Sequence, residues 1–428
     1  MGESEFNPRD LIAGPFQSCP KCGQPVFGVV MVRRDAYFRR CRRCFHSAIF
    51  MLPALRKKIL YLDQFAISNL VKALDPHTKG HGRTVADPFW TKLFEMLEIA
   101  AKMQLIVCPD SDEHRTESLV APFYTKLKRI YEHFSNGVSF HDSRTIRRVQ
   151  LVEMAERWLD GKKPECTLDP ALVTRGDLHG WQSPIGVSVT LPQEDEVLDE
   201  IRETRKRVHQ EMQIAFEYWR SEKLSFDERV AREAGQYGTK LLADVLQWRE
   251  RVREAQFGLN SVDPRGLYPT PAVEILTALI AAFRTRGLSE DEAPGKAFEF
   301  LRSDVPTAAP RRQIFGLLYA ALAMRAQNGQ VHAPNQGMAT DISVIADLLP
   351  YCDAMFVDNA ARALVEDIPK NRKPPYGCKV FSATVRTEFL AYLEQIVTAT
   401  SEEHRSVIQQ VYGDEYIRPY HEILSTNK

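Results

Sequence analysis

The sequence predicts an α/β protein in which a parallel sheet carries helices on both faces, with a large helical insertion and a small cysteine-containing unit at the N-terminus. Three observations lead to this fold class. Short apolar runs alternate with helical periodicity toward both ends of the chain, a long middle segment is helical throughout, and two cysteine pairs stand near the N-terminus. Alternating strands and helices are typical of parallel sheets, because a crossover must return the chain to the start of the next strand.

The totals bound the class of protein. At 428 residues and 44% hydrophobic content, the chain is long enough for two or three units with a sizeable core. Basic and acidic residues number 56 each, so any binding of nucleic acid must rest on local charge. No apolar run approaches the roughly 18 residues of a membrane helix, and the N-terminus lacks the apolar core of a signal peptide. We therefore expect a cytoplasmic protein with no membrane partner.

Two cysteine pairs have the spacing of a metal site. Cys19 and Cys22 form one CxxC pair, and Cys41 and Cys44 form a second after a gap of eighteen residues. Four thiolates at this spacing hold one Zn²⁺ tetrahedrally and leave no open position, so the ion would be structural. The stretch between the pairs predicts a hairpin, and we assign residues 1–52 to a zinc ribbon. A redox dithiol is the minor alternative, while the scattered other cysteines indicate a reducing compartment.

The predicted ribbon is locally basic, with arginines interleaved among aromatic residues. Arginines contact phosphates and aromatic rings stack on bases, so this surface is one candidate for nucleic-acid contact. A solvated face on a small domain is the alternative. The residues concerned are Arg33, Arg34, Arg39, Arg40, Arg42, Arg43, Tyr37, Phe38 and Phe45.

The first strand of the sheet is predicted at residues 59–62, an apolar run bounded by Lys57 and Lys58. It ends on Asp63, after which apolar residues recur with a helical period. An acid at this junction lies at the carboxyl edge of the sheet, where open α/β folds bind their ligands. Taken alone, Asp63 is better explained as the N-cap of the following helix.

The second strand, predicted at residues 104–108, leads into a segment dense in acids. Glu113 and Glu117 are four residues apart, so a helix would place both on one face, with His114 beside them. The ordinary enrichment of acids in the first turn of a helix explains part of this pattern. It explains less well why the acids fall at the same sheet edge as Asp63.

The middle segment, residues 119–334, is predicted to be a helical insertion. Charge alternation such as that of residues 200–211 is usual for a solvated helix face, although its arginines could also line a substrate channel. After the insertion, Thr340 and Asp341 open a helix, and a strand at residues 354–357 follows.

That late strand ends on Asp358 and is again followed by a helical pattern. A further strand is predicted at residues 379–382 and a helix at 387–397, and residues 401–428 form a C-terminal tail. Parallel strands end on one edge of a sheet, so the acids that follow them are expected to converge. Several carboxylates there would not all stay ionised without a counter-charge. Mg²⁺ or Mn²⁺, which prefer oxygen ligands, would supply it.

At these residues the chain resembles the PIN-domain superfamily of metal-dependent ribonucleases. YLDQFAISNL (61–70) looks like the first motif of that family, a strand ending in Asp and followed by a helix with a small polar residue. TDISVIADLLPYCDAMFVDNAARAL (340–364) looks like its closing motif. The resemblance implies a PIN-like, Rossmann-like sheet, with residues 57–118 and 335–400 as the nuclease core.

The resemblance also implies roles for the acids. Asp63, Glu117, Asp341 and Asp358 would hold two Mg²⁺ or Mn²⁺ ions, with Glu113 as a secondary ligand or the replacement for Glu117. Two such ions about 4 Å apart activate water and stabilise the leaving oxygen of a phosphodiester. The expected activity is that of an endoribonuclease, and RNA is favoured over DNA by family analogy alone. Two further residues would orient the ligands without touching the ions, Ser68 and Thr340.

Two other functions remain open. The first is a non-catalytic module that binds nucleic acid or protein through the ribbon, with the PIN-like core as a scaffold. The second is a metal-dependent phosphatase of the halo-acid type, which needs an Asp two residues after the first. Phe65 occupies that position and counts against it. A P-loop enzyme is not expected, because this sequence lacks the glycine-rich loop of that class.

Overall fold

The computed structural model describes residues 7–75, 87–121, 123–183, 195–258 and 264–424. At its centre lies a four-stranded sheet with the order β10-β9-β5-β6, in which every pair of neighbours is parallel. The strands are β5 (Lys58–Leu62), β6 (Ile106–Val107), β9 (Ala354–Phe356) and β10 (Lys379–Phe381). The predicted α/β class with a parallel sheet is confirmed. The second strand is shorter than the predicted 104–108, because Gln104 adopts a left-handed turn (φ 58°) after the preceding helix.

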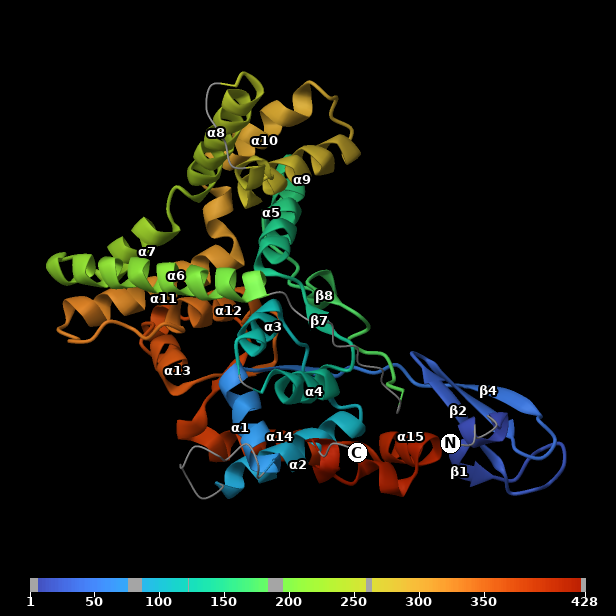
Figure 1. Cartoon of the computed structure of the whole chain (residues 1–428). Coiled ribbons are helices and arrows are strands. Elements are labelled where there is room, and N and C mark those ends of the chain that lie inside the picture. Colours follow the sequence, from blue (N-terminus) through green and yellow to red (C-terminus); the bar gives the residue numbers. More distant parts are fainter. Residues whose placement is uncertain (1–6, 76–86, 122, 184–194, 259–263, 425–428) are drawn as a thin grey trace.

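Alternating side chains of the strands pack into two hydrophobic layers. Ile59 and Tyr61 join one cluster, and Leu60 and Leu62 join the other. Helices supply the rest of each layer, so the prediction of helices on both faces is also confirmed (Figure 1). The layer around Leu60 contains α1 (Gln64–Leu74), α2 (Pro88–Lys102), α4 (Tyr124–Ser135) and α14 (Arg386–Thr398). The layer around Tyr61 contains α6 (Asp195–Ser221), α11 (Pro310–Gln327), α12 (Met338–Leu348) and α13 (Asn359–Glu366).

The long segment between β6 and α12 contributes helices to both layers of the sheet and also forms a separate helical lobe. It supplies α4 to one layer of the sheet and α6, α7 (Phe226–Ala234) and α11 to the other. It also contains a short antiparallel pair, β7 (Ser139–Phe140) with β8 (Thr174–Arg175). The rest forms a separate helical lobe with its own apolar core, seen at the top of Figure 1. The helices of this lobe are α5 (Ser143–Leu159), α8 (Tyr237–Gln256), α9 (Pro271–Thr285) and α10 (Glu292–Arg302).

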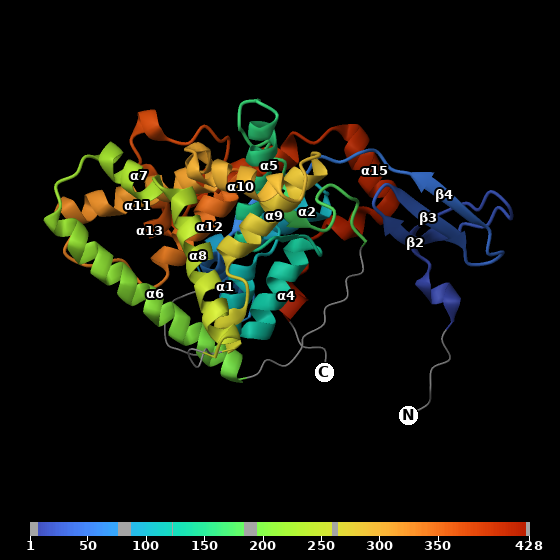
Figure 2. The same ribbon diagram turned by 90° about the horizontal axis from the view of Figure 1, so that it is seen from above.

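The N-terminal ribbon is a four-stranded antiparallel sheet, and its central hairpin lies where the sequence predicts one. Residues 401–428, expected as a tail, contain the helix α15 (Glu402–Tyr412). Ile408 and Val411 of this helix pack with Trp181 against the ribbon. Figure 2 shows α15 beside the ribbon strands at one end of the molecule. The strands are β1 (Ala13–Gln17), β2 (Phe27–Arg33), β3 (Ala36–Cys41) and β4 (Ser47–Met51).

Candidate functional site

Asp63 and Asp358 lie at the carboxyl ends of the neighbouring strands β5 and β9. Each is the N-cap of the helix that follows. Oδ1 of Asp63 accepts a hydrogen bond from the Gln64 amide at 2.8 Å, and Oδ1 of Asp358 accepts one from the Ala361 amide at 2.6 Å. Capping is therefore a real role of both acids. It engages one oxygen of each carboxylate, so it does not exhaust what either side chain can do.

The short helix α3 (Asp112–Leu119) is fixed to the end of β5 by His114. Nε2 of the buried His114 ring donates to the Leu62 carbonyl at 2.6 Å, and the ring stacks on Tyr61 with centroids 4.9 Å apart. Nδ1 accepts from the Ser111 amide, 3.2 Å away. Burial lowers the pKa of His114 to about 4, so the ring is neutral. His114 thus positions the helix that carries Glu113 and Glu117, a role that the sequence pattern does not reveal.

Four acids from separate elements influence one another electrostatically at this edge. Burial, together with the charges of Glu117 and Asp358, raises the pKa of Asp63 to about 7. Asp341 lies in the first turn of α12, which begins at Met338 rather than at the predicted Thr340. Burial and the charges of the other three acids raise the pKa of Asp341 to about 8. The fold therefore brings Asp63, Glu117, Asp341 and Asp358 into one region.

Glu113 is less closely coupled to this group. Burial raises its pKa to about 7, and the acids that add to the effect are Asp347 and Asp112. Glu117 is the α3 acid whose charge acts on both Asp63 and Asp341. Of the two glutamates that the sequence left open, Glu117 thus lies electrostatically closer to the other acids.

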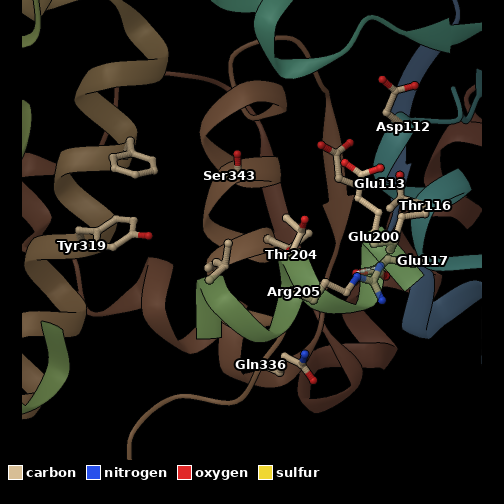
Figure 3. A pocket seen from close by; sticks show the side chains of 15 residues that line it. Asp112, Glu113, Thr116, Glu117, Glu200, Thr204, Arg205, Tyr319, Gln336 and Ser343 are labelled. Atoms are coloured by element: carbon tan, nitrogen blue, oxygen red, sulfur yellow. Dashed lines mark ion pairs between the residues drawn. The ribbon is translucent and has the colours of Figure 1, made fainter. Parts of the chain in front are cut away.

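A cavity of about 510 Å³ lies next to these acids, between α3, α6, α11 and α12. Figure 3 shows Glu113 and Glu117 on one side of it and Tyr319 on the other. Arg205 of α6 reaches into the cavity, with its Nη2 atom 3.9 Å from Oε1 of Glu117. Part of the charged 200–211 segment therefore faces this cavity. Nothing in the charge pattern of residues 200–211 distinguishes Arg205 from its neighbours.

The donor atoms at this edge are those that Mg²⁺ and Mn²⁺ prefer, namely carboxylate oxygens. An amide oxygen next to them, Oε1 of Gln64, is buried and has no hydrogen-bond partner in the part of the chain that the structure describes. However, among the described residues no three of these acids have oxygens that all lie within 4.8 Å of one another. Ser68 lies half-buried in α1, and Thr340 lines the cavity. The donor atoms are therefore of the kind that a divalent cation prefers, but their spacing in this structure does not form a three-ligand site for one ion among the described residues.

The four cysteines of the ribbon do converge. Cys19, Cys22, Cys41 and Cys44 place their sulfur atoms within 4.8 Å of one another, and two of the distances are 3.6 Å. A tetrahedron with Zn–S bonds of about 2.3 Å has edges of about 3.8 Å, close to these values. The amides of Arg43 and Cys44 point at Sγ of Cys41 from 3.4 and 3.5 Å, which favours its thiolate. The cluster could therefore hold a zinc ion.

The basic surface of the ribbon is smaller than the sequence suggests. Arg39 is fully buried and donates to the carbonyl oxygens of Pro15, Phe27 and Gln410, so its charge serves the packing of α15 on the ribbon. Tyr37 is buried as well. Tyr37 and Arg39 are two residues apart on β3, so both side chains point to the same, inner face of the sheet. The composition of the segment does not show which arginines face inward. The exposed members of the group are Arg33, Arg34, Arg40, Arg43 and Phe45.

No protein-family model, curated protein or solved structure matches this chain. Among the described residues, no helix has both the length and the apolar character needed to cross a bilayer. A function is therefore inferred from two features of the structure alone. One is the cysteine cluster, and the other is the carboxyl edge of the parallel sheet with Asp63, Glu117, Asp341 and Asp358, called the acidic edge below.

The raised pKa values predict how the metal-free protein responds to pH. Asp341 has a pKa near 8 in the folded protein and about 3.9 when unfolded, so the folded state binds more protons between these values. Stability should thus fall as pH rises from about 4 to 8. Asp341→Asn removes this loss, and its melting midpoint at pH 8 without divalent metal should exceed that of wild type by roughly 2–4 °C. At pH 4 the two proteins should melt together; a constant difference across the series would contradict the assignment.

Proposed function

We propose that this protein is a metal-dependent nuclease, and that it cleaves RNA as an endoribonuclease. The observation that supports the proposal is the coupling of Asp63, Glu117, Asp341 and Asp358. These residues come from four elements that are distant in sequence, and their charges act on the pKa values of Asp63 and Asp341 at the carboxyl edge of a parallel sheet. The four acids are half-buried, where mutual repulsion of carboxylates is costly, and such repulsion is found at functional sites that bind cations.

The residues of the chain would divide the work. The four acids would hold Mg²⁺ or Mn²⁺, which when bound attract a phosphodiester and make water more acidic. His114 holds α3, and with it Glu117, against β5. Arg205 places a positive charge in the cavity next to Glu117, where it would contact a phosphate of the substrate. The preference for RNA over DNA rests on the resemblance of the motifs alone.

A second candidate function is a non-catalytic binding module, in which the zinc ribbon contacts nucleic acid or protein. The observation that favours it is the capping role of Asp63 and Asp358, together with the absence, among the described acids, of three oxygens within 4.8 Å. In this case the acids would stabilise helices and bind no divalent metal.

The experiment that separates the two candidates is a cleavage assay with the full-length protein. Single-stranded RNA, single-stranded DNA and duplex substrates are incubated with Mn²⁺, with Mg²⁺ and without either ion, under conditions that leave the zinc of the ribbon in place. We expect cleavage of RNA that requires Mn²⁺ or Mg²⁺. Retention of the strands without cleavage, unaffected by either ion, would support the binding module and overturn the nuclease.

A further inference from the structure

The first turn of α11 carries an unusual concentration of positive charge. Arg311 and Arg312 follow Pro310 directly, and no described side chain caps the helix. The start of a helix is the positive end of its dipole, so cations there are unfavourable and anions are favoured. Arg147 of α5 lies close enough to add to the repulsion, since its pKa is lowered by burial and then by the charge of Arg311.

Only one of these three arginines has a carboxylate partner among the described residues. Arg311 pairs with the buried Asp347 and donates to the hydroxyl groups of Ser143 and Ser343 at 3.2 and 3.1 Å. Its charge is therefore compensated within the protein.

Arg147 and Arg312 are half-buried, and Arg147 interacts with the side chain of Tyr237. The Nε atom of each arginine also donates to a backbone carbonyl. These bonds run to Ser143 at 3.4 Å and to Ala234 at 3.3 Å. The charge of Glu233 acts to raise the pKa of Arg312, and that of Asp347 acts to raise the pKa of Arg147, but within the described chain neither arginine has a carboxylate within 4.0 Å. Burial, and the charges of the other two arginines, lower the pKa of Arg312. Two guanidinium groups thus keep their terminal N–H donors without an anionic acceptor.

A tyrosine hydroxyl completes the group. Tyr237, at the start of α8, is 9% exposed; its buried Oη atom faces Arg147, and among the described residues no acceptor for its O–H lies within hydrogen-bonding distance. The guanidinium carbon of Arg312 lies 5.1 Å from the centroid of the Tyr237 ring and 5.5 Å from that of Phe315. Aromatic rings cover the flat faces of a guanidinium group and leave its N–H edge available. A buried hydroxyl whose hydrogen has no acceptor costs free energy that a ligand oxygen would recover.

We propose that Arg147, Arg312 and Tyr237 form a binding site for a phosphate group, at the junction of α5, α8 and α11. The two guanidinium forks supply planar pairs of donors that match phosphate oxygens, and the Tyr237 O–H supplies one more donor. The phosphate belongs either to a small molecule, such as inorganic phosphate or a nucleotide, or to the backbone of a nucleic-acid strand. Phe315, which stacks under Arg312, also lines the cavity beside the acidic edge. The site is distinct from that edge and does not depend on nuclease activity.

The test is calorimetric titration of the full-length, zinc-loaded protein in the absence of Mg²⁺ and Mn²⁺, at constant ionic strength. The titrants are inorganic phosphate, a nucleoside monophosphate and a short single-stranded RNA. We expect wild type to bind phosphate and the nucleotide, and Arg147→Gln and Arg312→Gln each to bind at least about tenfold more weakly, as for the loss of a charge-assisted hydrogen bond. Arg144→Gln is the matched control, because it removes an exposed arginine of the same helix. It should change the affinity less than twofold.

Tyr237→Phe keeps the ring and removes only the hydroxyl, so it tests the site even if an arginine variant fails to fold. Its affinity for phosphate should fall about three- to tenfold. Binding of the RNA with the same dependence on Arg147 and Arg312 would identify a strand as the source of the phosphate. Binding of the small anions alone would identify a small molecule. Absence of phosphate binding in wild type, or equal binding in wild type and all three site variants, would overturn the proposal.

Discussion

Asp63→Asn is expected to reduce the Mn²⁺-dependent cleavage of single-stranded RNA by at least about 100-fold, since metal stabilisation of the reacting phosphate contributes several kcal/mol. The substitution separates the two roles of this residue. Asparagine caps a helix about as well as aspartate, so the hydrogen bond to the Gln64 amide and the fold should persist. Only the negative charge that would hold a cation is lost. The measurement is the initial rate of cleavage at several Mn²⁺ concentrations.

Asp112→Asn is the matched control for this experiment. Asp112 lies on α3 and lines the same cavity, but its ion pair is with Arg115, at 3.6 Å, and it is not one of the four coupled acids. Its rate should stay within about threefold of wild type. Equal cleavage by wild type and Asp63→Asn would show that Asp63 is a helix cap alone, and the nuclease assignment would fail.

Cys41→Ser is expected to unfold the ribbon and to release its zinc. Folding free energies of about 10 kcal/mol or more come from metal binding in small zinc units, because the site does not exist in the unfolded chain. The apolar cluster at the cysteines is small, because its buried members are only Cys19, Phe27 and Cys41 among the described residues. It is too small to hold the cysteine end of the ribbon together without the metal. Zinc content should fall from one ion per chain to near zero, and proteases should cleave between residues 13 and 51.

Cys166→Ser provides the comparison, because Cys166 is half-buried in the helical part of the chain and donates to the Gln150 carbonyl, away from the cluster. It should retain one zinc ion and a resistant ribbon. Since α15 packs on the ribbon through Ile408 and Val411, loss of zinc should also expose this helix to cleavage. A zinc-free wild-type protein with an intact, protease-resistant ribbon would contradict the structural role of the cluster.

The features that sequence reasoning predicted well are those encoded locally. The apolar run 59–62 followed by Asp63, and its counterpart ending on Asp358, gave the parallel sheet, because burial on both faces demands continuous apolar residues. The two CxxC pairs gave the cysteine cluster, because ligand spacing is itself the signal. In both cases the structure depends on a few residues that are close together in the sequence.

The features that could not be predicted depend on contacts between distant segments. Nothing near Arg39 indicates that it is buried against the Gln410 carbonyl of α15. The 119–334 segment reads as uniformly helical, yet its helices divide between the two layers of the sheet and a separate lobe. Helical periodicity shows that a face is buried but not against which partner. The contact between Arg205 and Glu117 likewise joins two segments that are distant in the sequence, so the local pattern does not predict it.

The most direct test of the proposed function is to locate Mn²⁺ by anomalous X-ray scattering in crystals of the full-length protein soaked with Mn²⁺. We expect manganese peaks among the carboxylates of Asp63, Glu117, Asp341 and Asp358. We also expect a zinc peak among the four cysteines, which serves as an internal control in the same data. A zinc peak without manganese at the acidic edge would contradict the proposed function.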